Sequence, residues 1–218
     1  MTDFGLRERK KARTRQVIAD AAARLFAQHG FEQVAVRDVA REAEVSEQTV
    51  YNYFRTKEQL VTDREQLVEE ELCRLIRTRI PGTTPAAAIR EFVLDGVERI
   101  RRYPAEQWRG ELGFLAAISP AVHRLALEMS DRQATALATA IAEADGVAPE
   151  IAKMRGIALA GVFQIIIAEA GRRTLDGQSQ NQIADELRPA IEAVLDDLDN
   201  WLTPARDQDS KNRATKAV

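Results

Sequence analysis

Apolar residues recur every three or four positions along most of this chain, a spacing that places them on one face of an α-helix. Glycine and proline, which interrupt helices, number only 11 and 7 among 218 residues. No alternating apolar and polar run is longer than a few residues, and no Asn-Gly or Asp-Gly pair lies between strand-like runs. The spacing therefore predicts an all-α fold.

Four helices are predicted in the first 79 residues. The first ends before Gly30, a residue that suits the end of a helix. Ser46 is a good N-cap for the third, and Thr56 with Gln59 has the pattern of a capping box for the fourth. The predicted helices cover residues 7–29, 36–43, 46–54 and 56–79, and the apolar stripe of the fourth consists of Leu60, Leu67, Val68, Leu72, Leu75 and Ile76.

A linker containing Pro81, Gly82 and Pro85 separates these helices from a longer helical part. Five further helices are predicted there, which brings the total to about nine. Pro189 lies inside the last of them and is expected to kink it or split it. These helices cover residues 86–102, 105–118, 121–144, 150–174 and 179–202.

Two short helices joined by a tight turn, residues 36–54, have the shape of a helix-turn-helix, whose second helix can enter the major groove of DNA. Val50 and Phe54 are predicted to point inward, while the other side chains of this helix are predicted to be exposed and can hydrogen-bond to bases and phosphates. Lys57 is expected near a phosphate, where a helix N-terminus also favours an anion. The exposed set is Glu47, Gln48, Thr49, Tyr51, Asn52 and Tyr53.

The charge distribution is consistent with an N-terminus that meets phosphate, although the net charge is −3. Residues 1–57 hold eleven basic and eight acidic residues, and six of the basic ones lie in Met1–Arg15. A basic end on an acidic body is expected when one end contacts nucleic acid. For residues 7–15 alone, a solvated helix face is the alternative.

Residues 9–61 resemble the TetR family of transcriptional regulators. The resemblance rests on Ile18–Phe31 and on Val36–Leu60, which contains a Thr-x-Tyr-x-x-Phe core and a Lys-Glu pair after it. It implies that residues 46–54, beginning at Ser46, form the DNA-contacting helix. Thr49, Tyr51, Tyr53 and Lys57 match positions that usually touch phosphate, Glu47, Gln48 and Asn52 match positions that tune sequence choice, and Arg37 matches an arginine often close to DNA.

Two residues depart from the family pattern. Ala35 stands where Ser or Thr usually caps the second helix, which forgoes about 1 kcal/mol. Glu44 stands in a turn that often contains Gly, and its carboxylate is expected to weaken DNA binding slightly unless it points away. Glu44, Glu47 and the negative net charge leave open a second hypothesis, a small-molecule-binding or protein-interaction module that no longer binds DNA.

Beyond residue 61 the family resemblance lies only in length and helix count. It implies a cavity for a small apolar or amphipathic effector, and pairing of the last two long helices with those of a second subunit. Residues 157–170 are apolar on nearly all sides and need cover, and apolar residues of the last helix recur at spacings of four and three. An intramolecular core is the alternative to the expected dimer interface, which consists of Ile157, Gly161, Ile165, Leu187, Ile191, Val194, Leu198 and Trp201.

Candidate effector-binding residues are large or polar side chains on otherwise apolar helices, a composition that suits a cavity or a packed core. His123 is expected at a surface or a helix start. Cys73 is interpreted as a core thiol, with a redox switch as the alternative. Two histidines and one cysteine argue against a metal site, and no cofactor is expected. The candidates are Phe92, Trp108, Glu111, Phe114, Met129, Met154, Phe163 and Gln164.

The sequence thus predicts a ligand-responsive regulator, a repressor that binds an inverted-repeat operator as a homodimer and is released by its effector. Its expected parts are a DNA-binding domain with a basic arm (1–56), an effector-binding and dimerisation domain (57–202) and a disordered polar tail (203–218). No catalytic constellation suggests an enzyme. A single cysteine, no signal peptide and no apolar run long enough for a bilayer predict a cytoplasmic protein without a membrane partner.

Overall fold

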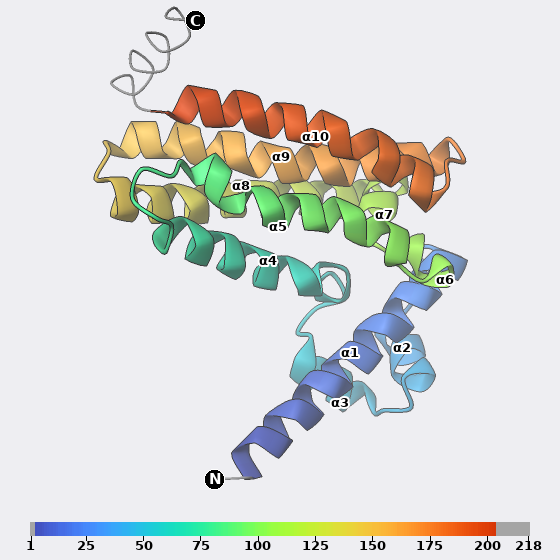
Figure 1. Cartoon of the computed structure of the whole chain (residues 1–218). Coiled ribbons are helices and arrows are strands. Elements are labelled where there is room, and N and C mark those ends of the chain that lie inside the picture. The colour runs from blue at the N-terminus through green and yellow to red at the C-terminus, as the bar shows by residue number, and fades with distance from the viewer. Residues whose placement is uncertain (1–2, 204–218) are drawn as a thin grey trace, which may run out of the picture.

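The computed structural model describes the backbone of residues 3–203 and the side chains of residues 9–203, except 64, 105 and 106. Every regular element in this range is a helix (Figure 1), so the all-α prediction is confirmed. The predicted polar tail lies outside the described residues, apart from Thr203, which caps the end of the last helix.

Three helices form the lower lobe in Figure 1, which we call the head: α1 (Asp3–His29), α2 (Val36–Glu42) and α3 (Glu47–Tyr53). Gly30 ends α1 with a φ of 76°, a left-handed conformation that glycine adopts without strain. α1 begins four residues earlier than predicted, and every other end of these three helices lies within one residue of its predicted position. Local caps and apolar spacing therefore suffice to define this part of the chain.

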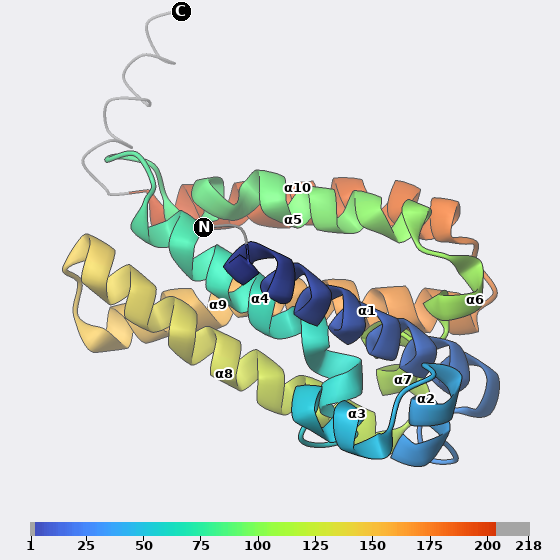
Figure 2. The ribbon, with the colours of Figure 1, turned by 90° about the horizontal axis from the view of Figure 1, so that it is seen from below.

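The remaining helices form the body above the head. α4 (Gln59–Arg77) connects the two parts and is followed by α5 (Pro85–Arg99), a 3-10 turn (Ile100–Arg102), α6 (Ala105–Trp108) and α7 (Leu112–Ile118). Three long helices complete it: α8 (Pro120–Asp145), α9 (Pro149–Leu175) and α10 (Gln180–Leu202). Seen from below, α1 crosses beneath α4, with α8 to one side and α5 and α10 to the other (Figure 2).

α4 begins three residues later than predicted, because only one of the two hydrogen bonds of the expected capping box forms between Thr56 and Gln59. The N–H of Gln59 donates to Thr56 Oγ1 over 3.4 Å, as in a capping box. The Gln59 side chain, however, accepts from the N–H of Arg55 at 2.7 Å instead of from Thr56. Residues 55–58 therefore form a bend between α3 and α4.

Two predictions about the later helices need correction. The helix predicted over 105–118 is interrupted at Gly110, where the chain passes so close to α1 that a Cβ atom would overlap the backbone carbonyl of Ala23. Of the two outcomes predicted for Pro189, a kink or a split, the split is contradicted, because α10 is one continuous helix. Pro189 lies on the exposed side of the helix, where water can hydrogen-bond to the carbonyl group that a proline leaves without a donor.

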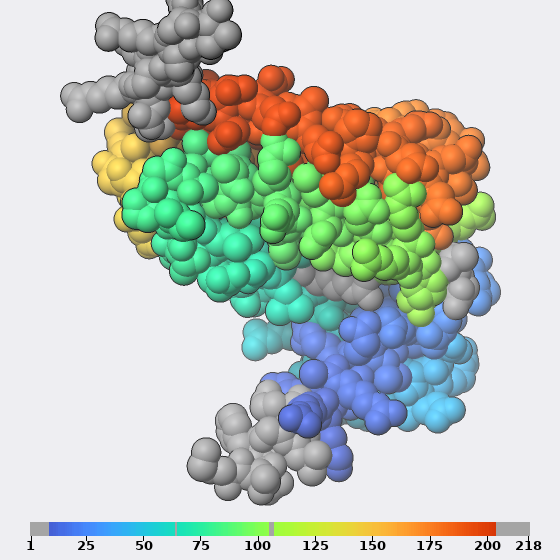
Figure 3. All heavy atoms as spheres, in the orientation of Figure 1, coloured from blue at the N-terminus to red at the C-terminus, as the bar shows by residue number. Residues whose placement is uncertain are grey.

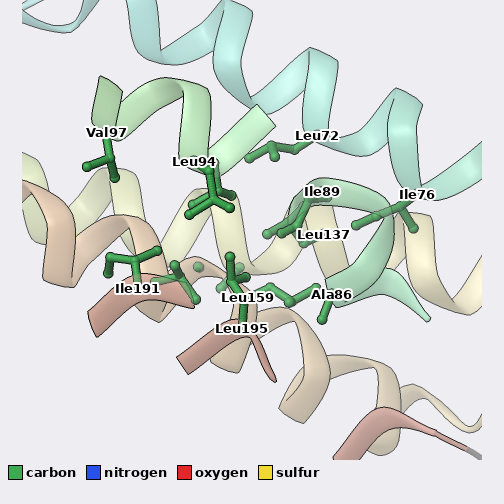
Figure 4. Packing of buried hydrophobic residues seen from close by; sticks show 14 of the residues in the cluster. Leu72, Ile76, Ala86, Ile89, Leu94, Val97, Leu137, Leu159, Ile191 and Leu195 are labelled. Carbon is green, nitrogen blue, oxygen red and sulfur yellow. The ribbon is translucent and has the colours of Figure 1, made fainter. Parts of the chain in front are cut away.

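The core of the body forms where α4, α5, α8, α9 and α10 meet (Figure 4). Leu72 and Ile76 of α4 face Ile89 of α5 and Leu137 of α8. Side chains of α10 close this core from the far side, and Leu187 and Ile191 are each only 1% exposed. These two residues were predicted to contact a second subunit. Their burial against α5 supports the intramolecular alternative for this part of α10.

A second hydrophobic cluster joins the head to the body. Phe26 and Val50 of the head lie in the same cluster as Leu112 and Leu115 of α7 and Val122 of α8. The head therefore shares a core with α7 and with the beginning of α8, although it stands out as a lobe in the space-filling view (Figure 3). The body holds the head through these contacts as well as through α4.

Leu67 departs from the predicted apolar stripe of α4, because its side chain is 66% exposed. Leu60 lies on the same helical face, seven residues earlier, and is buried in the cluster shared with the head. We attribute the difference to the position of the head, which covers only the first turns of this face of α4.

α9 carries more exposed apolar surface than the other long helices. Among the described helices it alone is long and apolar enough to cross a membrane by length and composition, with a mean hydropathy of 1.6 over its most apolar window. This differs from the prediction from sequence that no apolar run is long enough for a bilayer. Only 28% of that window is buried, and Met154, Ile157 and Ile165 are exposed. None of the residues that the structure describes covers this side of α9.

Candidate nucleic-acid interface and effector cavity

Ser46 fixes the start of α3. Its hydroxyl oxygen accepts from the N–H of Thr49 at 3.1 Å and lies 2.8 Å from the Thr49 hydroxyl. On the inward side, Val50 is fully buried and Phe54 closes the turn that follows. The predicted N-cap and the predicted inward pair are both present. They determine which face of α3 is left for solvent.

The outward face of α3 is polar, as predicted. Tyr51 is 45% exposed, and Glu47, Gln48 and Asn52 are also exposed. Gln48 Nε2 donates to Asn52 Oδ1 over 3.2 Å, so these two amides form a pair on the surface. An exposed row of amide, hydroxyl and phenol groups on one short helix has the reach and the donors and acceptors needed for base edges and phosphates. Ser46 extends this row and is exposed, whereas Thr49 and Tyr53 are half-buried.

Asp38, and not the residue at the N-cap position, provides the side-chain acceptor at the start of α2. Ala35 has no side-chain acceptor, but the carboxylate of Asp38 accepts from the N–H of Ala35 at 3.0 Å. This is half of a capping box, and it compensates in part for the missing Ser or Thr. Arg37 lies exposed in the first turn of α2. The predicted DNA contact at this position therefore remains sterically open.

Glu44 occupies the turn between α2 and α3 in a left-handed conformation, with φ of 55°. Among the described residues other than glycine it is the only one with a positive φ. This conformation costs an L-residue with a Cβ about 1–2 kcal/mol. The glycine common in the family at this turn is thus explained by backbone geometry, and Glu44 holds the same geometry at a cost.

Arg15, at the end of the predicted basic arm, has a structural role. Its Nε donates to Asp63 Oδ1 at 2.6 Å, its Nη1 donates to the carbonyl of Tyr53 at 3.0 Å, and its guanidinium lies 4.6 Å from the centre of the Phe54 ring. It therefore ties α1 to the end of α3 and to α4. The two alternatives considered for the arm were a solvated face and a phosphate contact. Arg15 has a third role, because its guanidinium bonds to Asp63 and Tyr53 within the protein. Nothing in the sequence pattern indicated this role, since Asp63 lies 48 residues away.

Lys57 lies between the turn that follows α1 and the start of α4. Its Nζ donates to the carbonyl of Glu32 over 3.4 Å and lies 4.2 Å from the centre of the Phe31 ring. Partial burial lowers the pKa of Lys57, while the charges of Glu32 and Glu58 oppose that shift. The ammonium group is therefore held at the edge of the head by Phe31 and Glu32.

The predicted effector-binding residues do not form one site. Met154 is exposed on α9, Trp108 donates its indole N–H to Thr174 at 2.9 Å, and Phe114 packs against the core shared with the head. Phe92 packs against the body core, and Glu111 precedes α7 beside a small cavity next to α1. Only Met129, Phe163 and Gln164 line a common cavity, between α4, α8 and α9.

That common cavity measures about 30 Å³, roughly the volume of one water molecule. A second cavity of about 290 Å³ lies next to it, between α7, α8 and α9, and approaches the size of small-molecule sites. Gln164 and Ile167 line both cavities. The lining of the 290 Å³ cavity is mostly apolar, with His123 and Gln164 as the polar groups. His123 is exposed, as predicted, yet it is part of this wall.

A larger cavity of about 590 Å³ lies at the far end of the body and is lined by Arg77, Arg79 and Arg155. Its arginines are paired with the carboxylates of Glu143 and Asp145. Among the described residues, no three His, Cys, Asp or Glu side chains lie close enough together to hold a metal ion. Cys73 is buried, and burial raises the pKa of its thiol.

These features define a class: an all-helical protein whose compact N-terminal head presents a helix-turn-helix. Residues 18–63 match the family described as bacterial regulatory proteins, tetR family. The match covers most of the head and the beginning of α4, so this part of the chain is a TetR-type helix-turn-helix domain. Sequence alone had indicated the same family from residues 9–61.

Solved structures show the same fold over most of the chain. NalD, the secondary repressor of the MexAB-OprM multidrug efflux pump in Pseudomonas aeruginosa, is 18% identical over 84% of this chain and 97% of its own, with a TM-score of 0.54. A Mesorhizobium loti protein assigned to the TetR-family transcriptional regulators is 19% identical over 84% of this chain and 96% of its own, with a TM-score of 0.50. At 18–19% identity, these similarities show a shared fold and nothing about function.

Proposed function

We infer that this protein is a one-component regulator that binds operator DNA through α3 and responds to a small molecule bound in the body. The single observation that carries this inference is the outward polar face of α3, held in place by Ser46 and Val50. Phosphate contacts are assigned to Thr49, Tyr51, Tyr53 and Lys57, with Arg37 beside them. Sequence choice is assigned to Glu47, Gln48 and Asn52.

A homodimer is part of this proposal, because an inverted-repeat operator requires two heads related by two-fold symmetry. The glycines of α9 support it. Gly156 and Gly171 lie where a Cβ would strike α8 and α7, at 2.8 Å from the amide nitrogen of Ala138 and 2.7 Å from the carbonyl carbon of Gly113. Gly161, in contrast, has no atom of the described residues within 4 Å of its Cβ position.

A glycine inside a helix costs about 1 kcal/mol relative to alanine, and no described residue contacts the Cβ position of Gly161 to compensate for that cost. Close approach of a second α9 at this position would provide the compensation. The exposed Ile157 and Ile165 lie on either side of Gly161 on the same face, and Trp201 is exposed near the end of α10. The proposed interface consists of this face of α9 with Val194, Leu198 and Trp201 of α10, and excludes Leu187 and Ile191.

The effector is assigned to the cavity between α7, α8 and α9. Its apolar wall suits an apolar or amphipathic molecule, with His123 and Gln164 as hydrogen-bonding partners. A molecule bound there would favour one arrangement of α7 over another, and DNA affinity would change by the difference in its affinity for the two arrangements. We propose release from DNA as the outcome, which makes the protein a cytoplasmic repressor and not a catalyst.

A mobility-shift titration with DNA from upstream of the protein's own gene tests the proposal. Wild-type protein is expected to form a specific complex that excess unrelated DNA does not displace. Tyr51→Ala and Lys57→Ala are expected to weaken it about tenfold or more. Gln28→Ala, an exposed change at the end of α1, is the matched control and is expected to have no effect. Equal binding by wild type and Tyr51→Ala would contradict the role assigned to Tyr51, and absence of any specific complex would favour the module that no longer binds DNA.

A further inference from the structure

The body touches the head at the turn between α7 and α8, where Ser119 lies. Ser119 is 6% exposed and caps α8, because its hydroxyl oxygen accepts from the N–H of Val122 at 3.3 Å. The same hydroxyl donates to Glu32 Oε1 at 2.8 Å. One buried side chain thus begins a helix of the body and holds a carboxylate of the head.

Glu32 belongs to the turn that follows α1, and its two ends have different partners. Its carboxylate accepts from Ser119 of the body, and its backbone carbonyl accepts from Lys57 of the head over 3.4 Å. The Phe31 ring beside it lies 4.2 Å from the Lys57 ammonium. A continuous path of three side chains therefore leads from the N-terminus of α8 to the lysine at the edge of the head.

We propose that Ser119 and Glu32 are positioning residues for Lys57, so that the α7–α8 turn sets the place of a DNA-contacting group. This deepens the proposed function and rests on Lys57 contacting phosphate. α4 is the covalent connection between body and head, and the Ser119–Glu32 bond adds a polar contact to the hydrophobic cluster that the two parts share. The effector cavity is lined by Ala116, Ala117 and His123, on both sides of the same turn. Displacement of the turn by a bound molecule would break the bond and release Lys57.

Two substitutions of Ser119 separate this link from the stability of α8. Ser119→Thr keeps both the cap and the hydroxyl donor. Ser119→Asp keeps a good N-cap, since Asp caps helices as well as Ser, but places a carboxylate against that of Glu32. Glu32→Ala breaks the same bond from the head side at an exposed position, with the α8 cap intact. Thr139→Asp adds the same charge to a distant exposed site on α8 and is the matched control.

Operator affinity measured over a range of salt concentrations is the first readout. Ser119→Asp and Glu32→Ala are each expected to weaken binding about five- to tenfold and to flatten the dependence of log K on log salt, as loss of a phosphate contact does. In a protein that already has Lys57→Ala, neither change should weaken DNA binding further, because both act through Lys57. This is expected even though the side chains of Ser119 and Lys57 do not touch. Wild-type affinity in Ser119→Asp and Glu32→Ala, or losses that simply multiply with that of Lys57→Ala, would overturn the proposal.

Hydrogen exchange of the DNA-free protein separates failure of this link from failure of the proposed function. Amides of residues 31–34 and 57–60 are expected to exchange faster in Ser119→Asp and Glu32→Ala than in wild type, Ser119→Thr or Thr139→Asp. Unchanged exchange in the first two variants would contradict the link even if the protein binds DNA. Faster exchange in a protein that binds no DNA would support the physical link, but would overturn its assignment to a DNA contact.

Discussion

Gly161 offers a sharp test of whether a second copy covers α9. Within residues 3–203 of one chain, no atom lies within 4 Å of a Cβ at this position, so Gly161→Arg should leave the fold of the chain intact. Arginine is also a better helix former than glycine. Any large effect of this substitution must therefore arise from contacts outside the chain.

The expected magnitude follows from what the substitution introduces into the proposed interface. An unpaired guanidinium buried between two apolar helices costs several kcal/mol, and each 1.4 kcal/mol is a tenfold change in dissociation constant. We expect the dimer to weaken at least a hundredfold. Gly161→Ala isolates the helix propensity, which is about 1 kcal/mol in favour of alanine when the face is exposed to water.

Sedimentation velocity over a concentration series measures the association, and urea unfolding measures the stability of the chain. Gly156→Ala is the matched control, because its Cβ would lie 2.8 Å from the amide nitrogen of Ala138 and should destabilise the chain by about 1–3 kcal/mol. A Gly161→Arg protein that associates as tightly as wild type would refute the reasoning. So would a loss of stability in Gly161→Arg larger than the lost association accounts for.

Three further changes test local features of the structure. Glu44→Gly removes the cost of a left-handed residue and should stabilise the protein by about 0.5–1 kcal/mol in urea unfolding, after the entropy cost of glycine, whereas Glu44→Gln should leave stability unchanged. Thr174→Val leaves the indole N–H of Trp108 without its acceptor and should destabilise by about 1–3 kcal/mol, which Thr174→Ser should not do; equal stability of the two would contradict the hydrogen bond. Because burial raises the pKa of Cys73, less thiolate is present at pH 8 than in an ordinary thiol, so alkylation should be slow until urea unfolds the chain. Rapid alkylation of the folded protein would show that the thiol is accessible.

The parts of this structure that were predictable from sequence are those fixed by neighbouring residues. Ser46 caps α3 through an amide three residues away, and the inward positions of Val50 and Phe54 follow from helical spacing alone. The family pattern of residues 9–61 adds a turn and a fourth helix in a known order. For this reason the outward face of α3 was predictable from sequence.

The parts that could not be predicted depend on which distant surface covers a residue. Leu67 and Leu60 share one helical face, yet only Leu60 is covered by the head. The position of Leu187 in the apolar pattern of α10 is the same whether α5 or a second subunit covers it, so the pattern cannot distinguish the two. Gly110 interrupts a helix because α1 passes beside it, and the bond between Ser119 and Glu32 joins residues 87 positions apart. Spacing along the chain contains no signal for such contacts.

Selection of binding sites from random double-stranded DNA tests the central claim most directly. The wild-type protein should enrich an inverted repeat whose half-sites are separated by about one helical turn or a multiple of it. Gln48→Ala and Asn52→Ala should change the preferred bases within each half-site while leaving its symmetry. Enrichment of no sequence, or of the same bases by wild type and both variants, would contradict the assignment of base recognition to α3.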